Sequence, residues 1–273
     1  MSHSPLKIAY NMRNHILKMA TQQNGAHIGG SLSSADILAV LFFHVLSLRP
    51  DEPDWVGRDY FILSKGHASA AYYAVLAEKG FISTEELDTY CQPGSRLAGH
   101  PKKGLPGLEF PTGSLGHGLS LGAGTALALQ RDGKANQVYV LMGDGELQEG
   151  SIWEAAMFAA HHKLGNLIGI VDKNKLQISG STNEVMNIDP LIQKWEAFGW
   201  NVKEVDGHSI AELTETFDQL PLETDAPCLI IANTIKAKGI SFMENNKKSH
   251  FVKFNAALYK KAHRELVATG EEE

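Results

Sequence analysis

The chain has 273 residues, of which 43% are hydrophobic and 21% are charged, a composition typical of a globular protein with a sizeable core. Its formal net charge of -6 argues against a nucleic-acid-binding surface, which is normally basic. We expect no membrane span and no export, because the sequence has neither a long apolar run nor a secretory signal. The two cysteines lie far apart and predict no disulfide or metal framework, which favours the cytoplasm.

The N-terminal third begins with a stripe of apolar residues at helical spacing, followed by glycine-rich sequence. A serine ahead of the next apolar run is typical of a helix N-cap, with Asp36 in the first turn. In chain order, we predict a helix over 5–22, a turn over 24–31, a helix beginning at Ser33 or Ser34, a strand over 59–63 and a helix over 68–79.

Residues 91–118 hold much Gly, Pro and His without a regular pattern, and such long ordered loops are usually functional. Beyond them, helices and strands alternate. We predict helices over 118–131, 151–162, 188–198 and 209–220, and strands over 138–142, 167–171, 201–205 and 228–232. This alternation predicts a single α/β domain over 1–273, with a parallel sheet covered by helices on both faces. Ligands bind such sheets at the carboxyl ends of the strands.

Two polar side chains follow neighbouring predicted strands. Asp144, in Gly-Asp-Gly, and Asn174 lie thirty positions apart, so we expect a carboxylate and an amide oxygen to meet at one sheet edge. With the backbone carbonyl of Leu176 they supply three oxygen ligands for a hard cation such as Mg²⁺. The Gly145 N–H and a helix starting near Gly150 favour a phosphate beside that cation. Gly-Asp-Gly alone is more often only a turn; its position between strand and helix favours the site.

The same residues resemble the thiamine diphosphate motif, in which Gly-Asp-Gly is followed about thirty residues later by Asn. The resemblance to transketolases covers residues 10–255 and is specific, because five motifs occur in the right order. These motifs are LSKGHA (63–68), GHP (99–101), TGSLGHG (112–118), GDGELQEG (143–150) and HKLGNLI (162–168). This resemblance implies the thiamine diphosphate-binding fold of the diphosphate (PP) type.

The resemblance also implies thiamine diphosphate with Mg²⁺, or Ca²⁺ or Mn²⁺ in its place, as cofactors. It assigns the metal to Asp144, Asn174 and the Leu176 carbonyl. Three histidines, His27, His100 and His250, would face the reacting sugar, where imidazoles can bind hydroxyls and move protons near neutral pH. The residues that would contact the cofactor are His67, Gly113, Ser114, Leu115, Gly145, Glu149, Asn174 and His250.

Some of these assignments have plainer alternatives. Each histidine could cap a turn or lie at the surface, and the charged residues beside His250 could belong to a solvated loop. Glu149 resembles the family's interface acid, although a glutamate in a first helical turn is also ordinary. The chain departs from many relatives at two positions, with Ser114 in place of proline and His117 in place of glutamine. We expect neither change to disable the site.

In transketolases, the glutamate that activates the cofactor belongs to a second, pyrimidine-binding domain, and no sequence resembling that domain is present here. We therefore expect an N-terminal subunit of a split transketolase, which transfers a two-carbon ketol unit from a ketose phosphate to an aldose. It would be active only with a separately encoded partner, in an α2β2 assembly. The alternatives are a 1-deoxyxylulose-5-phosphate synthase-like or 2-oxo acid dehydrogenase-like subunit, or a non-catalytic binding module of the same fold.

Overall fold

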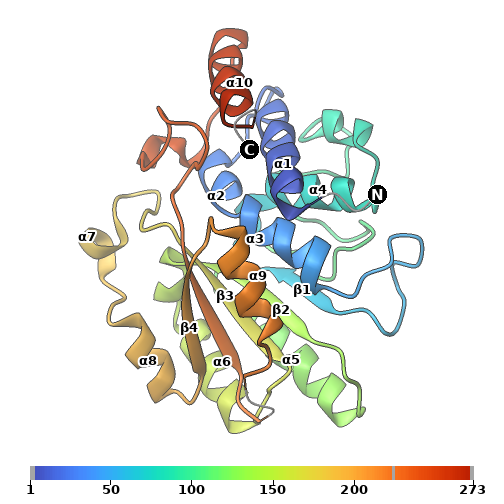
Figure 1. The fold of residues 1–273 in the computed structure, drawn as a ribbon, viewed down its shortest axis with the longest axis vertical. Coiled ribbons are helices and arrows are strands. Elements are labelled where there is room, and N and C mark those ends of the chain that lie inside the picture. Colours follow the sequence, from blue (N-terminus) through green and yellow to red (C-terminus); the bar gives the residue numbers. More distant parts are fainter. Residues whose placement is uncertain (1–3, 223–224, 271–273) are drawn as a thin grey trace.

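The structure is a computed structural model that describes residues 4–222 and 225–270. These residues form a five-stranded sheet, parallel throughout, with the strand order β1-β2-β3-β5-β4 (Figure 1). The strands differ from the predicted ones by at most two residues at either end. They are β1 (Tyr60–Leu63), β2 (Val138–Gly143), β3 (Leu167–Lys173), β4 (Asn201–Asp206) and β5 (Cys228–Asn233).

Helices cover both faces of the sheet, as predicted, because side chains alternate along each buried strand. Tyr139 and Leu141 of β2 belong to one buried cluster, whereas Val138, Val140 and Met142 belong to another on the opposite face. The first cluster packs against α1 (Pro5–Met19), α2 (Ile28–Ser33), α3 (Ala35–Val40), α4 (Ser69–Lys79) and α9 (Ile210–Asp218). The second packs against α5 (Gly118–Arg131), α6 (Gly150–His161) and α8 (Leu191–Ala197).

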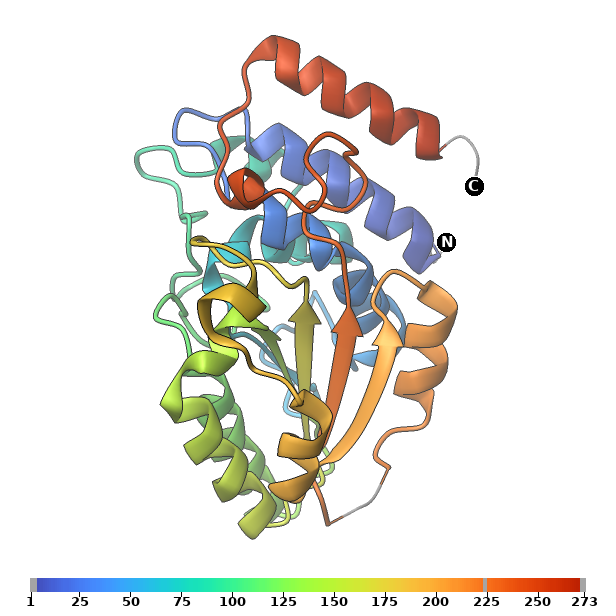
Figure 2. The ribbon, with the colours of Figure 1, turned by 90° about the vertical axis from the view of Figure 1, so that its left-hand side faces the viewer.

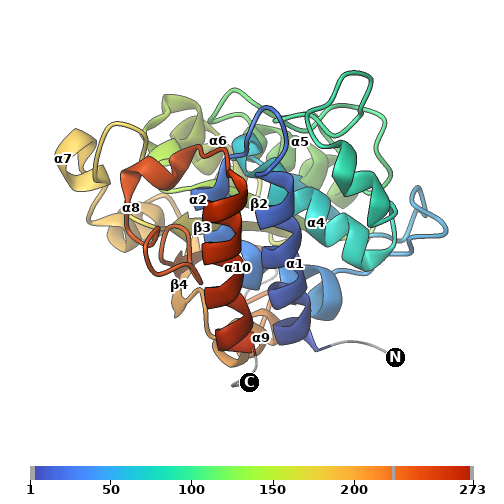
Figure 3. The same cartoon turned by 90° about the horizontal axis from the view of Figure 1, so that it is seen from above.

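The last helix, α10 (Ala256–Gly270), lies beside α1 (Figures 2 and 3). It buries Ala262 and Leu266 in the first cluster. A short helix, α7 (Thr182–Met186), follows β3 and was not predicted. Residues 91–117 contain no helix or strand, which confirms the predicted loop. None of the described helices is long and apolar enough to cross a membrane.

The predicted helix start at Ser33 or Ser34 is confirmed by α3, which has Ser34 as its N-cap residue and Asp36 in its first turn. The turn predicted over 24–31 is wrong in its second half. α2 spans Ile28–Ser33, so Gly29 and Gly30 of the predicted turn are helical. The segment packs too closely for a side chain at one of them, because a Cβ on Gly29 would lie 2.9 Å from the carbonyl oxygen of Ser249. Ser34 provides no side-chain cap; its hydroxyl instead donates to the Gly30 carbonyl at 2.8 Å. The glycine-rich segment before Ser34 is therefore a packed helix and not a turn.

The register of the sheet places the polar strand ends together. β2 and β3 are neighbours, and Gly143 lies opposite Asp172, so Asp144 and Asn174 follow adjacent strand ends. Parallel pairing brings the ends of β1 and β5 to the same edge. The segments that leave these two strands carry Lys65 and Lys236.

Candidate active site

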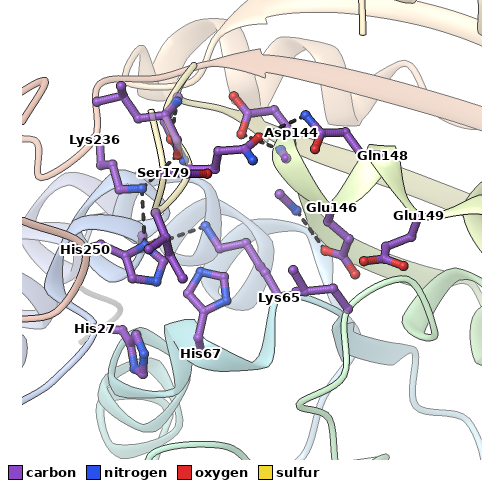
Figure 4. Close-up of a pocket in the computed structure, with 18 of the residues that line it drawn as sticks. His27, Lys65, His67, Asp144, Glu146, Gln148, Glu149, Ser179, Lys236 and His250 are labelled. Carbon is purple, nitrogen blue, oxygen red and sulfur yellow. Dashed lines mark hydrogen bonds between the residues drawn. The ribbon is translucent and has the colours of Figure 1, made fainter. Parts of the chain in front are cut away.

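A cavity of about 430 Å³ opens at the carboxyl edge of the sheet (Figure 4). Every predicted site residue except Ser114 lines it. Ser114 is exposed and lies outside the lining. The predicted residues that the fold brings together are His27, His67, His100, Gly113, Leu115, Asp144, Gly145, Glu149, Asn174, Leu176 and His250. Segments up to 223 positions apart in the sequence, from His27 to His250, therefore share one site.

Asp144 is buried at the cavity wall, with 2% of its surface exposed. Its carboxylate accepts hydrogen bonds from the backbone N–H groups of Gly145 (2.8 Å) and Lys175 (2.5 Å). Among the ion pairs of the described residues, none includes Asp144. Burial is the main cause that raises the pKa of Asp144 to about 6, and the negative charge of Asp172 is the second. A buried carboxylate without a direct ion-pair partner is suited to an incoming cation.

Asn174 and Leu176 supply the other oxygens of the predicted cation site. The Asn174 side-chain oxygen accepts from the Leu176 N–H at 3.2 Å, and Asn174 is 6% exposed. No group of three or more His, Cys, Asp or Glu side chains in the described ranges could hold a metal. A cation here would therefore take its ligands from the Asp144 carboxylate, the Asn174 amide and the Leu176 carbonyl. This all-oxygen set fits Mg²⁺ or Ca²⁺.

Two buried lysines at the cavity were missed by the sequence reasoning. Lys65 is 1% exposed and forms an ion pair with Asp172. Lys236 is 3% exposed; its Nζ donates to the Leu176 carbonyl at 2.7 Å and lies 3.4 Å from Nδ1 of His250. Burial is the main cause that lowers the pKa of Lys236 to about 8, and the positive charge of Lys65 is the second. Both lysines follow strand ends, and that position was the available signal in the sequence.

Four histidines form a cluster at the cavity, and Figure 4 shows His27, His67 and His250 near one another. The ring centre of His27 lies 5.6 Å from those of His67 and His100 and 5.3 Å from that of His250. Burial is the main cause that lowers the pKa of His27 and of His250 to about 4, and that of His67 well below 6.5. These three rings are therefore neutral at pH 7, so each has one nitrogen that donates and one that accepts.

Glu146 connects the cavity wall to the loop that carries Gly113 and Leu115. Its carboxylate accepts from the N–H groups of Gly116 (2.9 Å) and Gly143 (3.0 Å). The Ser64 hydroxyl donates to the same carboxylate. Burial raises the pKa of Glu146, which is 1% exposed. This side chain holds the loop in place against the strand ends, and the sequence reasoning assigned it no role.

Comparisons with known proteins identify the family to which the chain belongs. The family model described as "Transketolase, thiamine diphosphate binding domain" matches residues 6–269. An apulose-4-phosphate transketolase subunit from Phocaeicola vulgatus is 44% identical over 254 residues, which cover 93% of this chain and 90% of that relative. A 6-deoxy-6-sulfo-D-fructose transketolase subunit of a Clostridium species is 43% identical over 262 residues, covering 94% of this chain and 95% of the relative.

A solved transketolase structure shares the fold. The Campylobacter jejuni enzyme superposes with a TM-score of 0.88 at 35% identity over 96% of this chain. The match covers only 43% of that longer chain. Fold and site thus define a thiamine diphosphate-binding domain built on a parallel α/β sheet. The chain belongs to the transketolase family, and its predicted identity as an N-terminal, diphosphate-binding subunit is confirmed by relatives of similar length.

Proposed function

We propose that the chain is one subunit of a thiamine diphosphate-dependent transketolase that transfers a two-carbon ketol unit between a ketose and an aldose. The observation that carries this proposal is the convergence of Asp144, Asn174 and a histidine cluster on one cavity at the carboxyl edge of the sheet. The charged and polar groups divide that cavity into two ends. One end suits a cation and a diphosphate, and the other suits a hydroxyl-rich sugar.

At the first end, Asp144, Asn174 and the Leu176 carbonyl would hold Mg²⁺, Ca²⁺ or Mn²⁺. Lys236 would contribute a charge-assisted hydrogen bond to the diphosphate. Its Nζ already lies within reach of Leu176 and His250, which line the same wall. The start of α6 at Gly150 adds a backbone dipole that favours a phosphate. The Gly145 N–H, predicted to bond the phosphate, donates to Asp144 in this structure. His67 completes the set of diphosphate contacts.

At the second end, this chain's own residues would bind the substrate and move protons. When bound, thiamine diphosphate supplies a nucleophilic carbon and accepts the electrons released by carbon–carbon cleavage. His27, His100 and His250 would bind the ketose hydroxyls. Because burial keeps His27 and His250 neutral, each can accept a proton from one oxygen and donate to another near pH 7. Gly113 and Leu115 would line the cofactor rings.

A separately encoded, pyrimidine-binding subunit would complete the site in an α2β2 assembly. Glu149 supports this proposal, because it lies exposed at the rim of the cavity, where a partner's acidic group could reach it. The relative from Phocaeicola vulgatus is itself named as one subunit of its enzyme. The chain itself would form a single diphosphate-binding domain over residues 1–273 and act in the cytoplasm.

We infer the substrate class from two relatives. One is named for apulose-4-phosphate and the other for 6-deoxy-6-sulfo-D-fructose, so each of those substrates carries an anionic group away from its ketol end. A ketose with a distal phosphate or sulfonate is the corresponding donor for this chain. The groups that would recognise that anion are expected on the partner subunit.

Steady-state ketol transfer tests the proposal. The chain is assayed alone and with a co-expressed pyrimidine-domain subunit, using thiamine diphosphate, Mg²⁺ and either a ketose phosphate with an aldose or pyruvate. Activity with the ketose phosphate that requires both subunits is the expected result. Robust transfer by the isolated chain would refute the split enzyme, and turnover of pyruvate alone would favour the synthase-like or dehydrogenase-like alternatives. Failure of the pair to bind thiamine diphosphate and Mg²⁺ would indicate a non-catalytic module.

A further inference from the structure

Asp172 is a buried carboxylate for which the proposed reaction gives no role. It is fully buried and lies on β3 two residues before Asn174. Its oxygens accept hydrogen bonds from Ser33 (2.6 Å), Lys65, Asn174 (3.1 Å) and Thr234. These donors come from α2 and from the segments that follow β1, β3 and β5. Asp172 therefore joins four parts of the chain beneath the cavity.

The contacts of Asn174 fix which way its amide points. The NH₂ group donates to the Asp172 carboxylate, which can only accept, and the amide oxygen accepts from the Leu176 N–H. A flipped amide would place oxygen against carboxylate oxygen and NH₂ against N–H, losing both bonds. The surroundings thus select the orientation in which the oxygen lies on the side of Leu176, toward the predicted cation site.

Lys65 neutralises Asp172 and has no donor left for a ligand. Its ammonium carries three N–H donors, and the three acceptors around it are the Gly30 carbonyl (3.0 Å), the Ser34 hydroxyl (2.8 Å) and Asp172. The ion pair therefore holds Asp172 in place without leaving an unbalanced charge beneath the cavity. The negative charge that faces a cation is that of Asp144.

We propose that Asp172 is a positioning residue for the cation site, because its carboxylate holds the Asn174 amide with the oxygen directed at the cation. This inference rests on the proposed function, since it assumes that Asn174 binds a cation that carries thiamine diphosphate. Partners of this kind, which orient a metal ligand without touching the metal, typically change metal affinity 10–100-fold when they are removed.

Two double variants of the full chain separate positioning from charge. K65M/D172N and K65M/D172L both remove the ion pair, so their charges match, and Asn and Leu are similar in size. Only Asn keeps an oxygen that can accept from the Asn174 NH₂ group. Binding of Mn²⁺ in the presence of thiamine diphosphate is measured by electron paramagnetic resonance of the free ion. We expect K65M/D172N to stay within about fivefold of the unmodified chain and K65M/D172L to bind about 10–100-fold more weakly.

Equal affinities of the two variants, whether both retained or both weakened, would overturn the positioning role. The first result would leave Asp172 a structural residue, and the second would mean that its charge alone matters. If the unmodified chain binds neither Mn²⁺ nor thiamine diphosphate, even with its partner, the proposed function itself fails, and this outcome is distinct. Circular dichroism verifies that both variants fold.

A second measurement needs no folded variant at position 172. In the unmodified chain, the side-chain NH₂ resonances of Asn174 are assigned by their loss in N174D. Their hydrogen exchange is then compared with that of Asn245, whose side chain is exposed. A bond to a buried carboxylate predicts exchange slower than at Asn245. Equal exchange rates would contradict the proposed anchoring of Asn174.

Discussion

Two buried aspartates in this chain lie beside cavities but differ in what surrounds them. Asp36, on α3, receives both Nη groups of Arg13 at 2.9 and 2.6 Å and lies 2.7 Å from Nδ1 of His208. Although burial opposes the shift, Arg13 lowers the pKa of Asp36 to about 2. Asp144 receives only backbone N–H groups, and its pKa rises to about 6. Asp36 is thus held in an ion pair within the protein, whereas Asp144 has no ion pair among the described residues.

This contrast, and not volume, distinguishes the proposed active-site cavity from the second cavity. The cavity beside Asp36 has a volume of about 580 Å³, against about 430 Å³ for the one beside Asp144. Yet the two polar side chains nearest each other in the larger cavity, Asp36 and His208, are already paired: the Ile235 N–H donates to Nε2 of His208, which leaves its Nδ1–H for Asp36. A carboxylate that is already held in an ion pair is costly to disturb, whereas a buried carboxylate without an ion pair is free to bind a cation.

The largest expected effect is on stability and concerns Asp36. Asp36→Asn leaves the buried Arg13 guanidinium without its countercharge, so the free energy of unfolding should fall by about 3–5 kcal/mol. Urea denaturation at pH 7 measures this change. At a temperature where the variant remains folded, its affinity for thiamine diphosphate should equal that of the unmodified chain. A loss below about 1 kcal/mol would mean that the cluster is not a structural centre.

The matched substitution at the other aspartate should change binding instead. Asp144→Asn removes the charge that balances the cation, so Mn²⁺-dependent binding of thiamine diphosphate should weaken by about 100-fold or more. Isothermal titration calorimetry on the complex with the partner subunit measures it. The unfolding midpoint without cations should not fall. Binding within about threefold of the unmodified value would remove Asp144 from the cation site.

A pH series without divalent cations sharpens the same contrast. The pKa of Asp144 is about 6 in the folded chain and 3.8 in the unfolded one. Between these pH values, the folded chain therefore keeps a proton on Asp144 that the unfolded chain has lost. The unmodified chain should therefore lose stability through this group as pH rises from about 4 to 6, and D144N should not. The difference in free energy of unfolding between D144N and the unmodified chain should change in favour of D144N by on the order of 2 kcal/mol between pH 4 and 6. Parallel pH curves for the two proteins would contradict the raised pKa, because all other titrating groups are shared.

The smallest expected effect concerns two lysines on the segment after β5. Lys236 lines the cavity beside Asp144, and Lys238 lines the cavity beside Asp36. Lys236→Met should weaken thiamine diphosphate binding about tenfold, because one charge-assisted hydrogen bond to the diphosphate is lost. Lys238→Met is the control, since Lys238 lines the cavity beside Asp36. Affinity for thiamine, which lacks the diphosphate, should be unchanged in both variants. Equal losses for thiamine and thiamine diphosphate would show that Lys236 acts through packing instead.

Much of the fold could be predicted because its signals are local. Buried parallel strands are short apolar runs, and all five were located to within two residues. Helix α2 was missed because its glycines predict a turn, whereas Gly29 in the folded chain packs closely against Ser249, a contact between distant segments that the sequence does not record. Residues that line the cavity could be predicted where a recognisable motif or strand end marked them, as for Asp144 and Asn174.

The sequence by itself determined which strands exist, that they run parallel, and that a carboxylate and an amide follow two of them. Strand geometry then requires these groups to share one edge. Only the tertiary structure decided that Lys236 contacts Leu176, sixty residues away in the sequence. It also decided that Lys65 forms an ion pair with Asp172, and that, within the described residues, Asp36 rather than Asp144 forms an ion pair. Such pairings depend on how distant side chains converge in space, and neither composition nor periodicity records that convergence.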